Sequence, residues 1–324
     1  MSNDQSNSQR NNSQEITPRG RRMRKRTAII LIVIIAAGAG VGIWAGVTYN
    51  VNNAFCSASA PIKIVAAENF WGSLVSQLGG SQVEVLSIVT DPNADPHEYE
   101  SNTANARAFS CANLVIVNGA GYDSWALQLI SAGNNPGQTV LNVQELVGQA
   151  IGANPHFWYN PAFVNETVNA MYNDLVAIDP ANATYFTQQY VALNASLGPY
   201  IQKIAAIKNQ YANVKVASTE SIFVYLANAT GLDLISPPDF MDAISEGNDP
   251  AASDVATFQN QLTSHSVQIL VYNNQTVTPI TTQMQNLAKS NNIPVVGISE
   301  TVVPPNTQFQ DWMFAELVSI QNAL

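Results

Sequence analysis

One of the three histidines of this 324-residue chain lies in a setting that suits metal binding. His97 belongs to the stretch DPNADPHEYE, among four carboxylates and two prolines, directly after the apolar, β-branched run VEVLSIVT. An imidazole binds a divalent cation when further ligands converge on it, whereas a lone histidine in a polar loop is usually only solvated. The chemistry of His97 therefore depends on residues elsewhere in the chain.

Three further candidate ligands also follow predicted strands. His156 lies in NPHFWYNP, Glu220 ends VKVASTE and Glu300 ends PVVGISE. In open α/β sheets, ligands bind beyond the carboxyl ends of the strands, so residues in these positions can meet in one cleft. Two imidazoles and two carboxylates suit a borderline to hard divalent cation. Each residue also has a structural explanation: helix capping by Glu220, solvation of Glu300 in a loop, and packing of His156 on an aromatic neighbour.

The segments that must position these residues alternate between strand and helix patterns. Apolar, β-branched runs occur as IKIVAA, VEVLSIV, NLVIVNG and TVLNV, and again as VKVAS, LDLIS, VQILVY and PVVGIS. Strands that alternate with helical segments predict parallel or mixed sheets covered by helices on both faces. We therefore expect an α/β protein with two similar lobes, each a small, mostly parallel sheet flanked by helices.

A segment without strand signal separates the two sets of strands. In residues 180–210, apolar side chains recur at helical spacing, which predicts one long, rigid helix between the lobes. Gly198 and Pro199 could kink or divide it. The last segment, FQDWMFAELVSIQNAL, is amphipathic and is expected to pack on the second sheet. His265, at a predicted helix end in LTSHSVQ, is interpreted as structural.

The N-terminal region predicts a membrane anchor. Residues 1–26 are polar and basic, and residues 27–47 contain no charge, about the 20 apolar residues that a spanning helix needs. The positive-inside rule then predicts a single-pass plasma-membrane protein with a cytoplasmic N-terminus and an extracytoplasmic main domain. A cleaved signal peptide is the alternative interpretation of the same residues.

The predicted organisation has six parts. They are a basic tail (1–26), a transmembrane anchor (27–47), a linker (48–60), an N-terminal lobe (61–179), a connecting helix (180–210) and a C-terminal lobe (211–324).

Composition limits the partners and the compartment. Cys56 and Cys111 are the only cysteines, and an even count outside the cell predicts one disulfide. The formal net charge of −10 argues against nucleic acid as a partner, and a monomer is expected. The exported part also contains Asn-x-Ser/Thr sequons that permit glycosylation. They begin at Asn165, Asn182, Asn194, Asn228 and Asn274.

Four segments together resemble a known family, the metal-binding cluster A-I of solute-binding proteins that deliver manganese, zinc or iron to ABC importers. DPHEYE is similar to the family's DPHxYE loop, and CANLVIVNGAGYDSWALQL to the segment that follows it. NPHFWYNP resembles a PHxWxDP motif, with Asn160 where an Asp is common. STESIFVYLANATGL resembles the segment that carries the third ligand, and ISEGNDPAASDVATFQNQL a later loop and helix.

The resemblance implies a binding protein without enzymatic activity. It implies two α/β lobes joined by a rigid helix, and a metal between them held by His97, His156, Glu220 and Glu300. The family usually has Asp at the position of Glu300, so nearby acidic residues are alternative fourth ligands. These are Asp239, Asp242, Glu246 and Glu98. The implied cargo is Mn²⁺, with Zn²⁺ or Fe²⁺ as alternatives, and the implied partner is the permease of an ABC importer.

Two other classes of function remain open at this point. A surface metallohydrolase could use Glu100 or Asp95 as a general base beside a metal-bound water, although the chain lacks an HExxH motif. A cell-surface adhesion domain would need no metal, and only the sequons favour it. Removal of the metal distinguishes these classes, because adhesion would survive it and transport would not.

Overall fold

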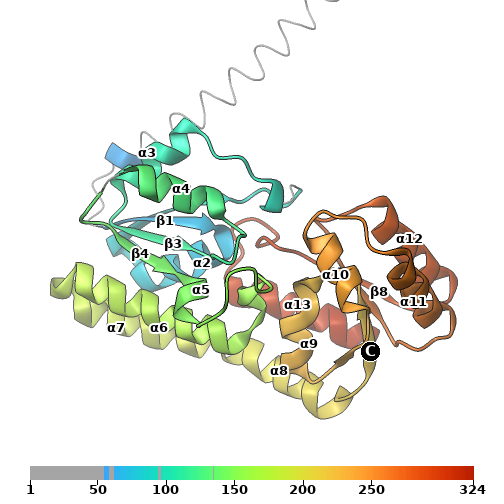
Figure 1. Ribbon diagram of the computed structural model, residues 1–324. Coiled ribbons are helices and arrows are strands. Elements are labelled where there is room, and N and C mark those ends of the chain that lie inside the picture. Colours follow the sequence, from blue (N-terminus) through green and yellow to red (C-terminus); the bar gives the residue numbers. More distant parts are fainter. Residues whose placement is uncertain (1–54, 58–61, 94–95, 134) are drawn as a thin grey trace, which may run out of the picture. The chain divides into compact units, whose positions relative to one another are not determined.

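Figure 1 shows the computed structural model, which describes residues 55–57, 62–93, 96–133 and 135–324. The predicted tail (1–26) and anchor (27–47) lie outside the described residues, as does most of the predicted linker (48–60). In the ranges that are described, no helix has both the length and the apolar composition that crossing a bilayer requires.

The first sheet contains four parallel strands in the order β2-β1-β3-β4. They are β1 (Ile62–Glu68), β2 (Val83–Val89), β3 (Leu114–Val117) and β4 (Thr139–Asn142). The central strands β1 and β3 are almost fully buried, as their continuous apolar runs require in a parallel sheet covered on both faces.

Helices cover both faces of this sheet. They are α2 (Asn69–Gly79), α3 (Thr103–Cys111), α4 (Ser124–Gly133), α5 (Val143–Leu146) and α6 (Pro161–Ile178), with short 3-10 helices η1 (Gly80–Gln82), η2 (Pro96–Glu98) and η3 (Phe157–Tyr159). Successive side chains of a strand point to opposite faces. Accordingly, Ile64 packs into the core shared with α2 and α6, and Val65 into the core shared with α3 and α4. Each face of the strand therefore stabilises a separate helical layer.

The second sheet repeats this arrangement. Its strands β5 (Lys215–Ser218), β6 (Asp233–Leu234), β7 (Leu270–Asn273) and β8 (Val295–Ile298) are parallel, in the order β6-β5-β7-β8. The helices of this lobe are α9 (Val224–Thr230), α10 (Pro238–Ser245), α11 (Ala252–Thr263) and α12 (Pro279–Ser290), with η5 (Ser221–Phe223). The predicted fold class, two similar α/β lobes with parallel sheets, is confirmed.

The predicted connecting helix is divided in two. A short 3-10 helix η4 (Pro180–Asn182) leads into α7 (Ala183–Ser196), which is followed by α8 (Gly198–Tyr211). Pro199 lies in the first turn of α8, where its missing N–H costs no helical hydrogen bond. In Figure 1, α7 runs beside α6 and α8 continues to the second lobe.

The C-terminal helix connects the lobes a second time. α13 (Phe309–Ala323) packs on α8 and β8 and also contacts α2 of the first lobe. The Phe309 N–H donates to Ser73 Oγ at 3.0 Å, and Gln310 Nε2 donates to Gln77 Oε1 at 2.8 Å. The chain therefore returns to the first lobe after completing the second.

Cys56 and Cys111 form a disulfide, which confirms that prediction. It joins the described residues that precede β1 to the end of α3. The asparagines of the five sequons are all exposed or half-buried, so their side chains are accessible, and glycosylation stays a prediction.

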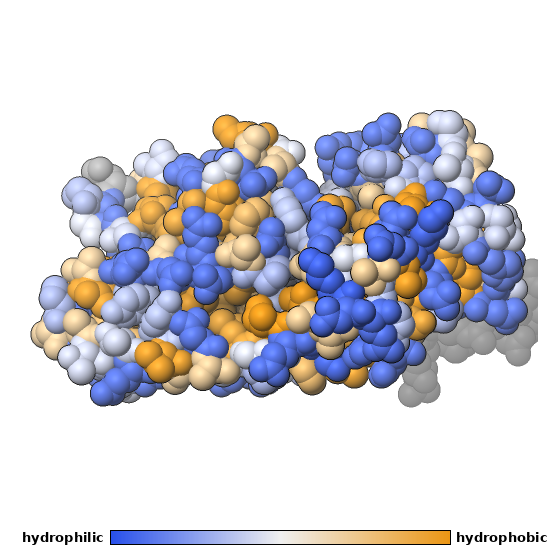
Figure 2. Space-filling view, turned by 90° about the horizontal axis from the view of Figure 1, so that it is seen from below, coloured by the Kyte–Doolittle hydropathy of each residue, from blue (hydrophilic) through white to orange (hydrophobic). Residues whose placement is uncertain are grey.

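The surface seen from the side of α7 and α8 is mixed in character. Figure 2 shows apolar residues interspersed with polar ones on this face. Val191 of α7 and Ile201 of α8 are 62% and 45% exposed. Dispersed apolar residues of this kind are normal on solvated protein surfaces.

Candidate metal centre

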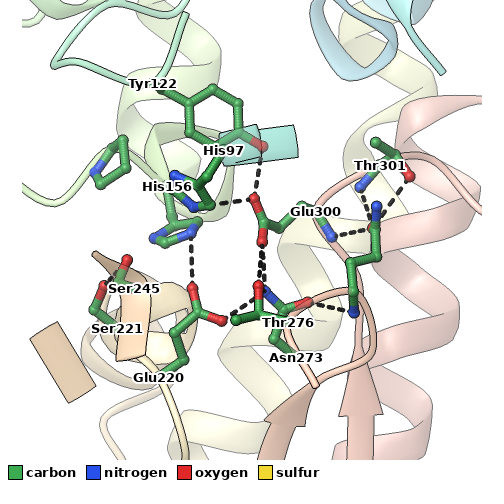
Figure 3. A network of polar contacts seen from close by, with 12 residues as sticks. His97, Tyr122, His156, Glu220, Ser221, Ser245, Asn273, Thr276, Glu300 and Thr301 are labelled. Carbon is green, nitrogen blue, oxygen red and sulfur yellow. Dashed lines mark hydrogen bonds and ion pairs between the residues drawn. The ribbon is translucent and has the colours of Figure 1, made fainter. Parts of the chain in front are cut away.

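Three segments that follow strands, and the loop between α5 and η3, bring the predicted ligands together. His97 lies in η2 after β2, His156 directly precedes η3, Glu220 follows β5 and Glu300 follows β8. One ligand atom from each of the four lies within 4.8 Å of the others (Figure 3). Two of these residues come from each lobe, at the edge where parallel α/β sheets place their ligands.

The four side chains form two imidazole–carboxylate pairs. His97 Nε2 lies 3.4 Å from Glu300 Oε2, and His156 Nε2 lies 3.4 Å from Glu220 Oε1. The side chain of His97 is 22% exposed, whereas the other three are fully buried. Each pair joins a histidine of the first lobe to a glutamate of the second.

Asn154 fixes the orientation and the tautomer of His156. Its Nδ2 donates to the Ser221 carbonyl at 2.7 Å, so its Oδ1 is the atom that lies 2.7 Å from His156 Nδ1. An amide oxygen only accepts, so Nδ1 is the donor, and in its neutral form the ring presents the Nε2 lone pair to Glu220. A metal-binding imidazole is usually held in this way.

Asn273, the last residue of β7, holds both glutamates. Its Nδ2 donates to Glu220 Oε2 at 2.6 Å and to Glu300 Oε1 at 2.5 Å. Gln275 fixes the backbone beside them, because its Oε1 accepts from the N–H groups of Glu300 and Thr301 at 2.8 and 2.9 Å. The sequence pattern singles out neither amide, although Asn273 ends a strand at the same edge as the predicted ligands.

Tyr122 also contacts the site. Its hydroxyl donates to Glu300 Oε2 at 2.7 Å, and its ring lies edge-on to that of His97. The loop that carries Tyr122 is held by Asp123, which accepts from the N–H groups of Asn118 and Gly119 at 2.6 and 2.8 Å. The segment NGAGYDSW contributes to the resemblance described above, but its sequence does not show that the tyrosine reaches the fourth ligand.

Burial changes the acid–base properties of this cluster. The pKa of Glu300 is raised, mainly because burial disfavours the charged carboxylate, and Glu220 raises it further. His97 opposes the shift of that pKa. A divalent cation would offset the repulsion between the two carboxylates, so the charged cluster suits a bound cation.

A cavity of about 730 Å³ between the lobes leads to His97. It is also lined by Glu98, Asp242 and Glu246, three of the four alternative ligands. These carboxylates lie outside the four-residue cluster, and Asp239 is absent from both sets. The pKa of Asp242 is raised, first by burial and then by the nearby carboxylates of Glu246 and Asp239.

The remaining candidates lie elsewhere. His265 is exposed just beyond the end of α11, apart from the cluster, as expected for a structural residue. Glu100 is exposed, and Asp95 lies outside the described residues. Glu100 is not part of the four-residue cluster.

Comparisons with known proteins agree with this fold and with the predicted family. The family model for the zinc-uptake complex component A, described as periplasmic, matches residues 64–323. The metal ABC transporter substrate-binding lipoprotein FimA of Streptococcus parasanguinis is 26% identical over 254 residues, which cover 74% of this chain and 79% of FimA. The manganese-binding lipoprotein MntA of Halalkalibacterium halodurans is 25% identical over 183 residues, which cover 54% of this chain and 59% of MntA.

A solved structure shows the same fold. The solute-binding protein FpvC of Pseudomonas aeruginosa, in complex with Mn²⁺, has a TM-score of 0.67 with this chain. The two sequences are 21% identical, and the alignment covers 81% of this chain and 98% of FpvC.

The relatives correct the predicted localisation. Residues 27–47 predict a single-pass plasma-membrane protein, but FimA and MntA are lipoproteins, so that prediction is wrong. An uncharged run of about 20 residues satisfies the hydropathy criterion for a spanning helix, whichever role the segment has. Apolar length alone therefore does not identify a retained anchor.

Proposed function

Because the chain belongs to the zinc-uptake complex component A family, we propose that it is an extracytoplasmic solute-binding protein. It captures one divalent transition-metal cation and delivers it to the permease of an ABC importer. The ligands are His97, His156, Glu220 and Glu300. The observation that carries this proposal is the convergence of these four side chains from four separate segments of the chain. Family relatives are substrate-binding proteins of metal transporters, so the chain is not an enzyme.

The paired acceptor atoms support a cation as the ligand. A neutral His156 that donates from Nδ1 to Asn154 points its Nε2 lone pair at a carboxylate oxygen of Glu220 3.4 Å away. Two acceptors that face each other repel unless a proton or a cation lies between them. Two ligands of a tetrahedral ion with bonds of about 2.05 Å are about 3.4 Å apart, so this spacing accommodates a first-row transition metal.

We propose Mn²⁺ as the favoured cargo, with Zn²⁺ and Fe²⁺ as alternatives. Two carboxylates make the donor set harder and more anionic than a set of three imidazoles, which suits Mn²⁺ or Fe²⁺. MntA is named a manganese-binding lipoprotein, and FpvC has been solved in complex with Mn²⁺ and with Ni²⁺, which supports a divalent transition metal and is consistent with Mn²⁺. Zn²⁺ stands higher in the general affinity order, so selectivity must come from geometry and availability.

We propose that the cation reaches the site past His97. This is the one partly exposed residue of the four, and it lines the cavity between the lobes. Glu98, Asp242 and Glu246 on the same cavity attract cations, an effect that salt screens.

We also propose that the protein is a monomer. Its two lobes are proposed to comprise residues 61–179 and 211–324, with residues 180–210 connecting them.

Titration of the metal-stripped protein with Mn²⁺, Zn²⁺ and Fe²⁺ tests this function. His97→Ala and Glu220→Ala should each weaken binding by well over tenfold, because even changes to residues behind the ligands cost about 10–100-fold. His265→Ala is the matched control, since it removes an exposed histidine outside the cluster. Equal affinities for all four proteins would reject the proposed ligand set.

A further inference from the structure

We propose that Asn273 is a positioning residue that limits Glu220 and Glu300 to one metal-binding oxygen each, and thereby sets the balance between Zn²⁺ and Mn²⁺. This inference rests on the proposed function, since it requires that the four-residue cluster binds a divalent cation. A residue that does not bind the cation thus controls how many carboxylate oxygens bind it.

The hydrogen bonds of Asn273 divide the oxygens of the two glutamates by role. Glu220 Oε2 and Glu300 Oε1 each accept from Asn273 Nδ2. The opposite oxygens, Glu220 Oε1 and Glu300 Oε2, are the atoms that face His156 Nε2 and His97 Nε2. One oxygen of each carboxylate is therefore bonded to the amide and the other faces a histidine, and the Tyr122 hydroxyl also donates to this second oxygen of Glu300 (Figure 3).

Neighbouring residues hold Asn273 in the orientation that this division requires. Its side chain is 1% exposed, and its Oδ1 accepts from the Gln275 N–H at 2.9 Å, so Nδ2 is the end that meets the glutamates. Thr276 Oγ1 lies 3.1 Å from the same Nδ2 and donates to Glu300 Oε1 at 3.3 Å. Rotation of the amide would break several of these contacts at once.

Denticity follows from these contacts. A carboxylate that binds a cation through both oxygens must rotate its second oxygen toward the cation, which weakens its hydrogen bond to Asn273, and a buried amide that loses its acceptors is destabilising. With one oxygen from each glutamate, two imidazoles complete a four-ligand set of the kind Zn²⁺ prefers. Hard cations gain more from bidentate carboxylates and higher coordination numbers. Asn273 therefore makes the ratio of Zn²⁺ to Mn²⁺ affinity higher than the donor types alone would make it.

The test uses the full chain, stripped of metal, with Asn273 replaced by Ala and by Ser. Asn273→Ser keeps one hydrogen-bond donor and serves as the second variant if Asn273→Ala does not fold. Asn105→Ala is the matched control, because Asn105 is also a buried asparagine but belongs to the capping box of α3. Affinities for Zn²⁺ and Mn²⁺ are measured by competition with a chromophoric chelator, and Co²⁺ absorption reports the coordination number.

The ratio of Zn²⁺ to Mn²⁺ affinity should fall by about tenfold in Asn273→Ala and less in Asn273→Ser, within the range seen for residues behind metal ligands. The visible absorption of bound Co²⁺ should weaken as its coordination number rises, and Asn105→Ala should change neither quantity. An unchanged ratio and spectrum, with metal still bound, would overturn the role of Asn273 but leave the proposed function intact. Failure of the parent protein to bind any of these ions would instead reject the proposed function, and this inference with it.

Discussion

Each buried candidate ligand is held by a residue that the cation itself would not touch. Asn154 holds His156, and Asn273 holds Glu220 and Glu300. Such contacts fix ring and carboxylate orientations before the cation arrives, so less conformational freedom is lost on binding. The residues behind the ligands should therefore affect affinity nearly as strongly as the ligands do.

Replacing Asn154 tests this at a single residue. Asn154→Ala removes the acceptor that keeps the His156 proton on Nδ1, so the ring can turn or adopt the tautomer that protonates Nε2. We expect the affinity for the cation to fall about 10–100-fold in a titration of the stripped protein. Asn209→Ala, in the exposed part of α8, should leave it unchanged. Equal affinities in the two variants would contradict the role of Asn154.

Glu316 links the segments behind two of the ligands. Its Oε2 accepts from the Tyr159 hydroxyl at 2.7 Å, and its Oε1 accepts from the Ser299 N–H at 2.9 Å and from Trp312 Nε1 at 3.0 Å. Tyr159 lies three residues after His156, and Ser299 directly precedes Glu300. Burial raises the pKa of Glu316 to about 7, although these donors oppose the shift.

This raised pKa predicts the pH dependence of stability in the metal-free protein. Folded Glu316 binds a proton more tightly than the unfolded residue, so its contribution is complete below about pH 4.5 and is lost as the pH rises through about 7. Urea unfolding measures how far the free energy of unfolding falls between pH 4.5 and pH 8. This fall should be smaller in Glu316→Gln than in the parent, by on the order of 2 kcal/mol. Glu166→Gln, at an exposed position of α6, should behave as the parent does. An equal loss in all three proteins would refute this assignment.

At the scale of helices and strands, the order of elements explains why the ligand set is predictable. Glu220 and Glu300 each lie two residues beyond a strand, and His97 lies eight residues beyond the end of β2. Parallel strands place their carboxyl ends at one edge of the sheet. The alternation of apolar runs with helical segments predicts those strands, and the repeated order gives two similar lobes. Sequence periodicity therefore indicates both the fold and the edge at which the ligands gather.

The contacts of Asn273 and Tyr122 are not predictable in the same way. Asn273 lies in VYNNQT, where Asn274 or Gln275 could equally face the edge of the sheet, and only the register of β7 selects one of them. Tyr122 reaches Glu300 across 178 positions of the sequence. The division of the connecting helix at Leu197 depends on packing as well, since Pro199 permits either a kink or a new helix start.

The disulfide should contribute to stability and not to binding. It closes a sequence separation of 55 residues and attaches the segment before β1 to α3, whereas the ligands follow strand ends. Replacement of Cys56 and Cys111 by Ser should lower the unfolding free energy by about 2–4 kcal/mol, as measured by denaturant titration. The cation affinity should stay within about twofold, because the ligand loops keep their packing. A large loss of affinity without loss of stability would contradict this separation.

At the scale of the two lobes, the site depends on their joint position. The first lobe supplies the histidine and the second lobe the glutamate of each pair. The lobes are connected by α8, and again by the contacts of α13 with α2. All four ligand atoms already lie within 4.8 Å of one another, so a small inward movement would bring them to a single ion. We therefore expect capture of the cation to need little rearrangement of the lobes.

Anomalous diffraction from crystals of the protein loaded separately with Mn²⁺ and Zn²⁺ would test the central claim most directly. The proposed function predicts one strong peak at each metal's absorption edge, within about 2.0–2.3 Å of His97 Nε2, His156 Nε2 and one oxygen each of Glu220 and Glu300. A peak held instead by Glu98, Asp242 and Glu246 on the cavity, or crystals loaded with either ion that give no peak among the four residues, would contradict it.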